Sequence, residues 1–479
     1  MISFIRYPCE IRERLKVVKD QSSVRKSKYW LVSVSMGYGH LRAVYPLRSN
    51  SEKGVIRADK LPESGKFEKL KWKFITSLYE TVSRAGEKPV IGLIFRKLLN
   101  YFLYIPDNNY QGKKVPFQVR WLENAVKNGL GEGFVQHISY PHLPVVTSFY
   151  AVAIAAERAG YQNVCCIICD TDLSRAWVPA DSSRSRINYF VPEVNSATRL
   201  ISYGVDKERI KITGFPLPLE LLGDRDLTTL KMNLWRRLMH LDPQRAFFSK
   251  HETEVNNALK LNILSEKKNS SNDYCLTILY AVGGAGAQKK IGGDILKSLA
   301  VRIHQNNLRL IFAAGTRKDT RDYLMKIKNK ILPWNNNVEV LWAKDFESYY
   351  YLFNNALQET DILWTKPSEL VFYSALGIPI IMTKPLGPQE LANHNWLKNS
   401  GAGMEHPDPS FFNIWLTYQL NNGRLAEAAW NGFIKSIKSG TFNIMDQMEN
   451  ILKENDPSSL NIVRNIRDES NRRVRKFVL

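Results

Sequence analysis

The chain has 479 residues, which is too long for one hydrophobic core and predicts two large domains. Its composition, 44% hydrophobic and 24% charged, excludes a disordered chain, and no run of about 18 uncharged apolar residues is present to form a membrane-spanning helix. The formal net charge of +21, from 67 basic and 46 acidic residues, indicates an anionic partner: a phosphate-bearing substrate, an acidic membrane surface or nucleic acid.

The first half of the chain alternates strand-like and helix-like segments. Residues 1–20 carry charges throughout, so we expect no signal peptide. Strands are expected at 29–35, 143–148, 164–171, 187–192 and 210–216, and helices at 149–160, at 194–204 and from His40. This alternation predicts βαβ units around a parallel sheet.

A second alternating block follows a polar stretch. Its expected strands lie at 274–284, 308–316, 337–343, 359–367 and 377–385, and the chain is helical from about 410. The predicted organisation is two doubly wound α/β domains, with ligands in the cleft at the carboxyl ends of their strands. The predicted segments are a first domain at 1–222, a helical, polar linker at 223–273, a second domain at 274–425 and C-terminal helices at 426–479.

Three of the five cysteines, Cys165, Cys166 and Cys169, lie in one expected strand. Two of them have C-x-x-C spacing, but no second Cys or His pair follows at the spacing of a zinc site. Buried strand thiols are therefore favoured over metal ligands. Unpaired thiols indicate a reducing, cytosolic compartment.

A Gly-rich turn, "GYGH", follows the first expected strand. Gly37 and Gly39 allow close approach of the backbone, and a helix from His40 would direct its first N–H groups at the cleft. The His40 imidazole could then act as a general base. The same residues also fit a tight turn in which His40 makes only a structural hydrogen bond.

A second Gly-rich loop, "VGGAGAQKK", begins the second domain at 282–290. Gly283, Gly284 and Gly286, followed by Gln288 and a helix, expose N–H groups in the arrangement that holds a diphosphate. The loop does not fit the Walker A pattern, which requires Gly-Lys-Ser/Thr. A sharp strand–helix turn is the alternative.

Polar residues also follow later strands. Lys366 ends one strand, and the polar residues at the starts of the next two helices could bind a ribose or sugar, although singly they are ordinary helix-start residues: Glu369, Gln389, Glu390 and Asn393. Asp170 and Asp172 lie at the end of the strand expected at 164–171. No further acidic cluster is nearby, so capping is favoured and no metal site is expected.

Together these motifs resemble GT-B glycosyltransferases of the family-28-like branch, which contains monogalactosyldiacylglycerol synthase, processive diacylglycerol glucosyltransferases and the enzyme that adds N-acetylglucosamine to lipid I. "GYGHLRA" and "GGAGAQ" resemble the two Gly-rich loops of this family. "TKPSELVFYSALGIPIIMTKPLGPQELAN" is similar to the family pattern "TKPGG-x-T-x-x-EA-x-x-x-G-x-P" followed by "PGQE-x-x-N". The resemblance covers roughly 29–48 and 144–403.

The resemblance implies a GT-B fold: two Rossmann-like domains facing a central cleft, with C-terminal helices. It implies that His40 accepts the proton of the acceptor. Gly37, Gly39, Asp170 and Asp172 are the candidate loop residues on the acceptor side of the cleft. It also implies donor-binding roles for a set of residues: Gly283, Gly284, Gly286, Gln389, Glu390 and Asn393. Gln288, Lys366 and Glu369 are further candidates for donor binding, taken from their positions beside these residues.

Two positions depart from the family pattern. Glu369 stands where the family has glycine, and Ser374 stands where it has the glutamate that holds the ribose. Three readings stay open: Glu369 replaces the missing contact, the donor differs, or activity is lost.

The segment 69–106 mixes lysine and arginine with aromatic residues, which suits an interfacial helix on anionic lipid. A pair of core helices with solvated cationic faces is the alternative. In the resembling family this region contacts the membrane and the lipid acceptor.

The expected function is transfer, with inversion, of a sugar from a nucleotide-diphosphate sugar, a UDP-sugar, to a membrane lipid. It requires no metal or other cofactor. We expect a cytoplasmic protein, peripheral on the inner face of the cell membrane, and no nucleic-acid partner, because RNA-recognition and zinc-finger patterns are absent. The alternatives are a nucleotide-sugar epimerase of the same fold and a catalytically inactive sugar-nucleotide binding protein.

Overall fold

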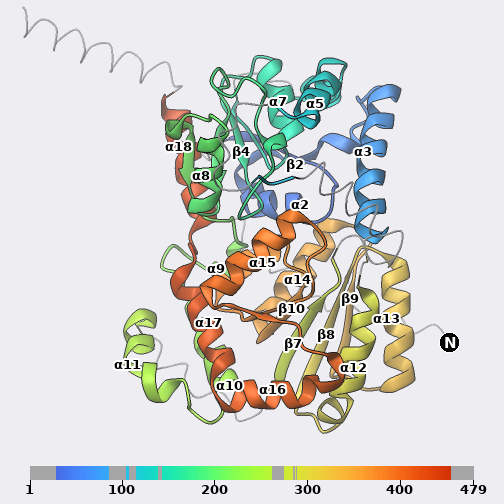
Figure 1. Ribbon diagram of the computed structural model, residues 1–479, viewed down its shortest axis with the longest axis vertical. Helices are drawn as coiled ribbons and strands as arrows, with labels where there is room; N and C mark the ends of the chain where they lie inside the picture. Colours follow the sequence, from blue (N-terminus) through green and yellow to red (C-terminus); the bar gives the residue numbers. More distant parts are fainter. Residues whose placement is uncertain are drawn as a thin grey trace, which may run out of the picture.

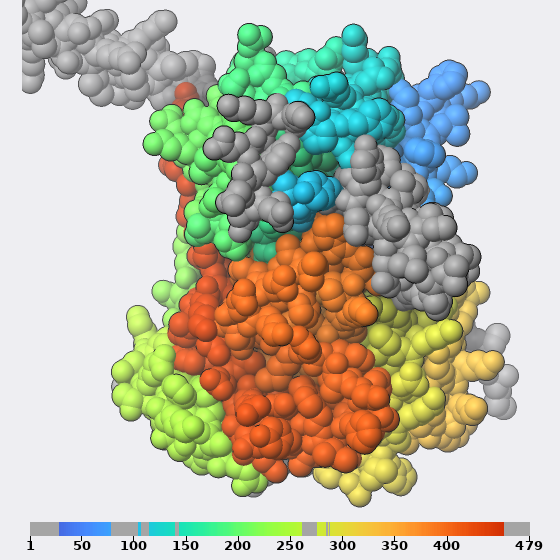
Figure 2. All heavy atoms as spheres, viewed as in Figure 1, coloured from blue at the N-terminus to red at the C-terminus, as the bar shows by residue number. Residues whose placement is uncertain are grey.

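The computed structural model describes residues 28–85, 104–106, 115–138, 143–260, 275–283, 286 and 288–454. Two α/β lobes are each built on a six-stranded parallel sheet (Figure 1). In the space-filling view, the residues coloured blue to green gather in one lobe and those coloured yellow to orange in the other (Figure 2). The predicted pair of doubly wound domains is confirmed.

The first sheet has the strand order β2-β1-β3-β4-β5-β6. Its strands are β1 Tyr29–Ser33, β2 Ser51–Arg57, β3 Val145–Thr147, β4 Val164–Ile167, β5 Asn188–Val191 and β6 Ile210–Ile212. Helices cover both faces of a parallel sheet, so its inner strands are apolar along their whole length. β1 and β4 are accordingly buried at every residue. Cys165, Cys166 and Cys169 are buried thiols, as predicted.

The second sheet has the order β12-β11-β10-β7-β8-β9. Its strands are β7 Leu276–Ala281, β8 Leu308–Gly315, β9 Val338–Trp342, β10 Ile362–Thr365, β11 Ile380–Met382 and β12 Gly403–Glu405. β7 and β10 pair in register at the centre, with Leu279 opposite Leu363. Both strands therefore end at the same edge, and the loops after them meet there.

Helices connect the strands in both lobes. The α-helices are α2 Gly39–Val44, α3 Lys66–Ala85, α5 Phe117–Lys127, α6 Glu132–His137, α7 Tyr150–Arg158, α8 Val194–Ser202, α9 Leu219–Leu222, α10 Thr228–Leu241, α11 Phe248–Leu259, α12 Lys289–His304, α13 Lys318–Ile331, α14 Phe346–Glu359, α15 Pro388–Ser400, α16 Phe412–Asn421, α17 Arg424–Lys435 and α18 Gly440–Glu454. The 3-10 helices are η1 Tyr45–Asn50, η2 Ala58–Lys60, η3 Arg175–Trp177, η4 Lys207–Arg209, η7 Glu369–Leu376 and η8 Pro409–Phe411.

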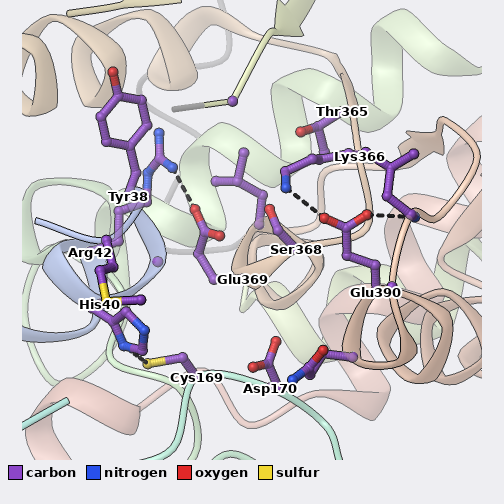
Figure 3. A pocket seen from close by; sticks show the side chains of 18 of the residues that line it. Tyr38, His40, Arg42, Cys169, Asp170, Thr365, Lys366, Ser368, Glu369 and Glu390 are labelled. Atoms are coloured by element: carbon purple, nitrogen blue, oxygen red, sulfur yellow. Dashed lines mark hydrogen bonds and ion pairs between the residues drawn. The ribbon is translucent and has the colours of Figure 1, made fainter. Parts of the chain in front are cut away.

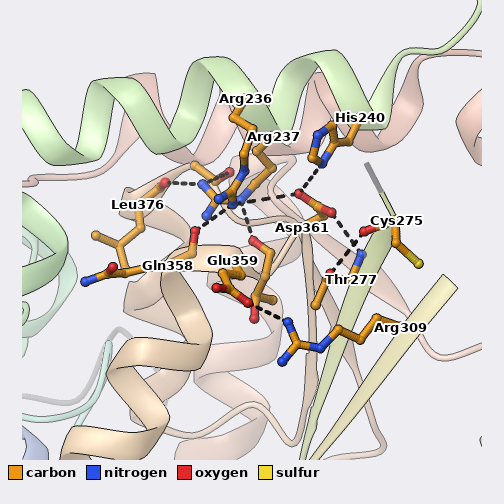
Figure 4. Close-up of polar contacts among 12 residues, drawn as sticks. Arg236, Arg237, His240, Cys275, Thr277, Arg309, Gln358, Glu359, Asp361 and Leu376 are labelled. Atoms are coloured by element: carbon orange, nitrogen blue, oxygen red, sulfur yellow. Dashed lines mark hydrogen bonds and ion pairs between the residues drawn. The ribbon is translucent and has the colours of Figure 1, made fainter. Parts of the chain in front are cut away.

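Polar side chains of α10 fasten this helix to the second sheet (Figure 4). The buried Arg237 guanidinium donates to the carbonyl oxygens of Thr360 and Leu376, at 2.8 and 2.9 Å, and to that of Gly377. The buried Asp361 carboxylate accepts from the backbone N–H of Thr277. α10 and α11 lie inside 223–273, whose assignment as a linker remains a prediction, as do the other domain boundaries.

α18 returns to the first lobe (Figure 1). The Asn443 side chain donates to the carbonyl oxygen of Thr213, and the Thr441 hydroxyl donates to that of Leu217. A Cβ added at Gly440 would lie 2.2 Å from the carbonyl oxygen of Phe215, so only glycine allows this crossing. The segment after β6 and the start of α18 therefore pack against each other where the chain passes between the lobes.

Candidate functional site

A cavity of about 170 Å³ lies between the lobes. Its walls come from the loops after β1 and β4 in the first sheet and after β7 and β10 in the second (Figure 3). It therefore occupies the place where parallel sheets bind ligands, outside the carboxyl ends of the strands.

The cavity brings together most of the residues that the sequence singled out. Those that line it are Gly37, Gly39, His40, Asp170, Gly283, Lys366, Glu369, Gln389 and Glu390. Asp172, Gly286, Gln288 and Asn393 are not among its lining residues, and Gly284 lies outside the described residues.

His40 is held by the junction between β3 and α7. Its Nδ1 lies 2.7 Å from the carbonyl oxygen of Ser148, and the Ser148 hydroxyl donates to the carbonyl oxygen of His40. Burial lowers the pKa of His40 to about 4, against the opposing effects of the Ser148 bond and the charge of Glu369. The imidazole is therefore neutral near pH 7, with its proton on Nδ1 and Nε2 left as an acceptor.

Apolar groups surround the imidazole. The ring centroids of Phe149 and Trp177 lie 5.0 and 6.0 Å from that of His40, and the Cys169 sulfur lies 3.8 Å from Nδ1. These neighbours explain the lowered pKa of His40, because they replace the water that would stabilise an imidazolium.

The two lobes meet at a buried ion pair. Nη1 of Arg42, from α2, lies 2.5 Å from Oε1 of Glu369, at the start of η7 (Figure 3). Burial would raise the pKa of Glu369, but the Arg42 guanidinium outweighs burial and holds it below its ordinary value. Both side chains are therefore charged, and Glu369 carries its charge inside the cavity.

Asn393 forms a second contact between the lobes. Its side-chain oxygen accepts from the N–H and hydroxyl of Thr171, and its Nδ2 donates to Oδ1 of Asp170 at 2.9 Å. Burial raises the pKa of Asp170 to about 7, and the charges of Glu369 and Glu390 act in the same direction. Asn393 thus positions a carboxyl group whose protonation changes near neutral pH.

On the second lobe, Lys366 and Glu390 form an ion pair, with Nζ 2.5 Å from Oε1. Glu390 also accepts from the N–H of Leu386. The Lys366 side chain reaches back to the turn after β7, where Cε lies 3.3 Å from the position a Cβ would take on Gly283. A side chain at residue 283 would therefore displace Lys366.

The second Gly-rich loop has left-handed backbone at three positions. The φ angles are +57° at Gly283, +71° at Gly286 and 63° at Gln288, which immediately precedes α12. The Gln288 side chain accepts from the Thr383 hydroxyl. The loop thus turns from β7 into α12 beside the cavity, and two further cations lie at this end of the lobe: Lys289 and Arg317, both paired with Asp319.

Two other positions that the sequence singled out, Asp172 and Ser374, contact neighbouring helices and do not line the cavity. Asp172 forms an ion pair with Arg199 of α8, with a shortest separation of 2.8 Å. Ser374 is fully buried and faces α17, since a Cβ on Gly432 would lie 3.1 Å from the Ser374 Cβ. Ser374 does not line the cavity, so the residue that stands at the position of the family glutamate makes no contact with the cavity in this chain.

Sequence reasoning missed Arg42 and Tyr38. The Tyr38 hydroxyl accepts from the N–H of Thr316 in the opposite lobe, and its ring lies over the Arg42 guanidinium. One signal was available: Arg42 is the charged residue within the otherwise apolar run "LRAV", which forms the buried end of α2.

A second feature of the first lobe is an apolar groove of about 440 Å³ between α3 and α5. Its large side chains include exposed ones: Phe67 (81%), Leu70 (61%), Phe74 (60%) and Trp121 (39%). Contiguous exposed apolar surface of this kind marks an interaction site. On its buried face, α3 places Trp72 against Phe149, with ring centroids 6.1 Å apart, so one aromatic layer separates this helix from His40.

In the part of the chain that the structure describes, no helix is long and apolar enough to cross a bilayer. The described residues also contain no group of three His, Cys, Asp or Glu side chains that could hold a metal ion. Within the segment predicted to contact the membrane, 69–106, residues 86–103 lie outside the described residues.

The chain has distant homologues among curated proteins, although no family model matches it. It is 24% identical over 239 residues to a processive diacylglycerol beta-glucosyltransferase of Staphylococcus carnosus, a match that covers 50% of this chain and 48% of the relative. A protein of the same description from Staphylococcus aureus is 22% identical over 263 residues, which is 54% of each chain. The chain thus spans about half the length of these relatives.

The solved structures that match this chain over most of its length are more distant in sequence. Acinetobacter baumannii MurG is 13% identical, with a TM-score of 0.45 over 88% of this chain and 99% of that one. Staphylococcus aureus MnaA, solved with UDP, is 12% identical, with a TM-score of 0.43 over 89% of this chain and 97% of that one.

Proposed function

We propose that this protein is an inverting GT-B glycosyltransferase that transfers a sugar from a nucleoside-diphosphate donor to a hydroxyl group of a membrane lipid. The observation that carries the proposal is the neutral His40 imidazole on the wall of the inter-lobe cavity, with Nδ1 committed to Ser148 and Nε2 left to accept a proton. The distant relationship to diacylglycerol glucosyltransferases supports the lipid acceptor.

In the proposed reaction, the acceptor oxygen attacks the anomeric carbon of the donor sugar. The new C–O bond forms as the bond to the diphosphate oxygen breaks, and the hydroxyl proton passes to Nε2 of His40. Backbone N–H groups of the turn from Gly283 into α12 would stabilise the departing diphosphate, with help from Lys366. Asn393 and Asp170 would hold the two lobes together around the donor.

The apolar groove between α3 and α5 is the proposed contact with the membrane. Exposed lysines flank its aromatic side chains on α3: Lys66, Lys69 and Lys73. Apolar side chains inserted among lipid tails, with lysines at anionic headgroups, would seat this helix on the membrane surface. Because Trp72 and Phe149 link the helix to His40, a lipid hydroxyl at this surface would lie near the proposed base.

A transfer assay tests the proposal. The full chain is incubated with UDP-glucose, UDP-galactose or UDP-N-acetylglucosamine and with vesicles of diacylglycerol and phosphatidylglycerol, and extracted lipids are analysed by mass spectrometry. A glycolipid whose formation releases UDP is the expected product. Conversion of the free nucleotide sugar without glycolipid would instead identify an epimerase.

The Glu369 carboxylate favours a second candidate, a sugar-nucleotide binding protein without transferase activity. A buried negative charge inside the cavity opposes a diphosphate. Calorimetry that detects UDP-sugar binding, together with vesicle assays that yield no glycolipid from any of the three donors, would establish this candidate in place of the transferase.

A further inference from the structure

Two lysine or arginine side chains among the described residues line the inter-lobe cavity, and each contacts a carboxylate. The two pairs differ in one respect. Lys366 and Glu390 belong to the same lobe, whereas Arg42 and Glu369 come from opposite lobes, 327 residues apart in sequence. Separation of the lobes would therefore break the Arg42–Glu369 pair and leave the other intact.

The cavity must widen to admit a nucleotide sugar. Its volume of about 170 Å³ is below the roughly 300–1,000 Å³ of ordinary small-molecule sites. Widening would leave the Arg42 guanidinium, which is 3% exposed here, without its counter-ion. A guanidinium in apolar surroundings is stable only when paired, so the open cleft would hold a strong anion-binding group.

The surroundings of Arg42 orient its guanidinium group so that it can bind a phosphate. The ring centroids of Phe353 and Tyr38 lie 4.6 and 5.3 Å from its guanidinium carbon, and these rings fix the plane of the guanidinium group. Glu369 accepts from Nη1, while Nε has no hydrogen-bond partner among the described residues. A phosphate group has enough oxygens to accept from both nitrogens, which a guanidinium offers as a bidentate donor.

We propose, on the basis of the proposed function, that Arg42 binds a phosphate group of the donor diphosphate and that Glu369 is the internal carboxylate which this phosphate displaces. Glu369 thus sets a threshold for donor binding: the donor must replace an ion pair that already holds the lobes closed. This role accounts for a glutamate at a cavity-lining position that otherwise opposes an anionic ligand.

The test is calorimetry with two probes, UDP and inorganic pyrophosphate, on the full-length protein. Glu369→Gln keeps the shape of the side chain and removes the charge, and we expect it to bind both probes roughly tenfold or more tightly than the original protein. Arg42→Met should bind both roughly tenfold or more weakly. Asp446→Asn is the matched control, because it removes a carboxylate from an arginine pair on the surface and should change neither affinity.

The double variant Arg42→Met with Glu369→Gln leaves no unpaired charge, so it keeps the test valid if Arg42→Met alone fails to fold. It should bind as weakly as Arg42→Met. Weaker UDP binding by Glu369→Gln would overturn the proposal, because Glu369 would then be a direct ligand of the donor. Unchanged binding in the Arg42 variants would also overturn it. Pyrophosphate binding that depends on Arg42, without any sugar transfer, would retain this inference and reject the proposed transferase.

Discussion

Nδ1 of His40 lies 2.7 Å from the carbonyl oxygen of Ser148. Because a carbonyl oxygen can only accept, this contact places the imidazole hydrogen on Nδ1 and leaves the lone pair on Nε2. Ser148 lies directly between β3 and α7, so the end of a sheet strand sets the tautomer that a general base needs.

The pH dependence of transfer should reflect the buried state of His40. Burial lowers its pKa to about 4, so the lone pair on Nε2 is lost only as the pH falls towards that value. We expect kcat/KM to show no decline at about pH 6.5, the ordinary pKa of histidine, and to fall near pH 4. Circular dichroism at each pH controls for acid unfolding. A fall centred near pH 6.5 in folded protein would contradict the assignment of His40 as a buried base.

Asp170→Asn should change how stability depends on pH. The pKa of Asp170 is raised to about 7 in the folded protein, so the folded state holds this proton more tightly than the unfolded chain. Ionisation of Asp170 therefore lowers the free energy of unfolding as the pH rises from about 4 to about 7. Urea unfolding at pH 5 and pH 8 should show the variant gaining stability relative to the original protein at the higher pH. If the free energies of unfolding of the variant and the original protein differ by the same amount at pH 5 and pH 8, the raised pKa of Asp170 is contradicted.

Phe74→Asp should separate membrane contact from donor binding. The side chain is 60% exposed in the groove between α3 and α5, and a carboxylate there would be repelled by anionic lipid. We expect loss of vesicle binding and roughly tenfold slower transfer to vesicle lipid, with unchanged affinity for UDP. Ile414→Asp, at an exposed position on the second lobe, is the control. Equal vesicle binding by both variants would reject this surface as the membrane contact.

Arg237→Met should strongly destabilise the second lobe. The guanidinium donates to three carbonyl groups in a buried site, and the variant leaves them without these donors. The expected loss in the free energy of unfolding is about 3 kcal/mol or more, measured by urea denaturation. Arg225→Met, at an arginine on the surface, should cost less than about 1 kcal/mol. Similar losses in the two variants would show that α10 is not fastened by Arg237.

Most of the fold could be predicted from the sequence, because buried parallel strands are continuous apolar runs. The two strands that escaped prediction, β2 and β12, each lie at one edge of a sheet, whereas the strands at the opposite edges, β6 and β9, were predicted. β2, "SEKGVIR", is buried only at Ile56, and β12 is three residues long with no buried position. An edge strand pairs on one side and faces solvent, so it needs no apolar run, and its position follows from β1 or β11 rather than from its own residues.

The site could be predicted less completely. His40 and the Gly-rich turns were identifiable because their motifs are local, and the structure brings them to one cavity. The partner of Glu369 was not identifiable, because Arg42 lies 327 residues away and the pair exists only where the lobes meet. The pKa values of His40 and Asp170 likewise depend on burial by residues far away in the sequence, which no local pattern records.

The most direct test of the account is sugar transfer by His40→Ala in the vesicle assay, with UDP affinity and the midpoint of thermal unfolding measured on the same preparation. Loss of the general base should slow transfer at least about 100-fold, while donor affinity and folding stay near those of the original protein. Full transfer activity in the folded variant would remove His40 from the chemistry and contradict the central claim.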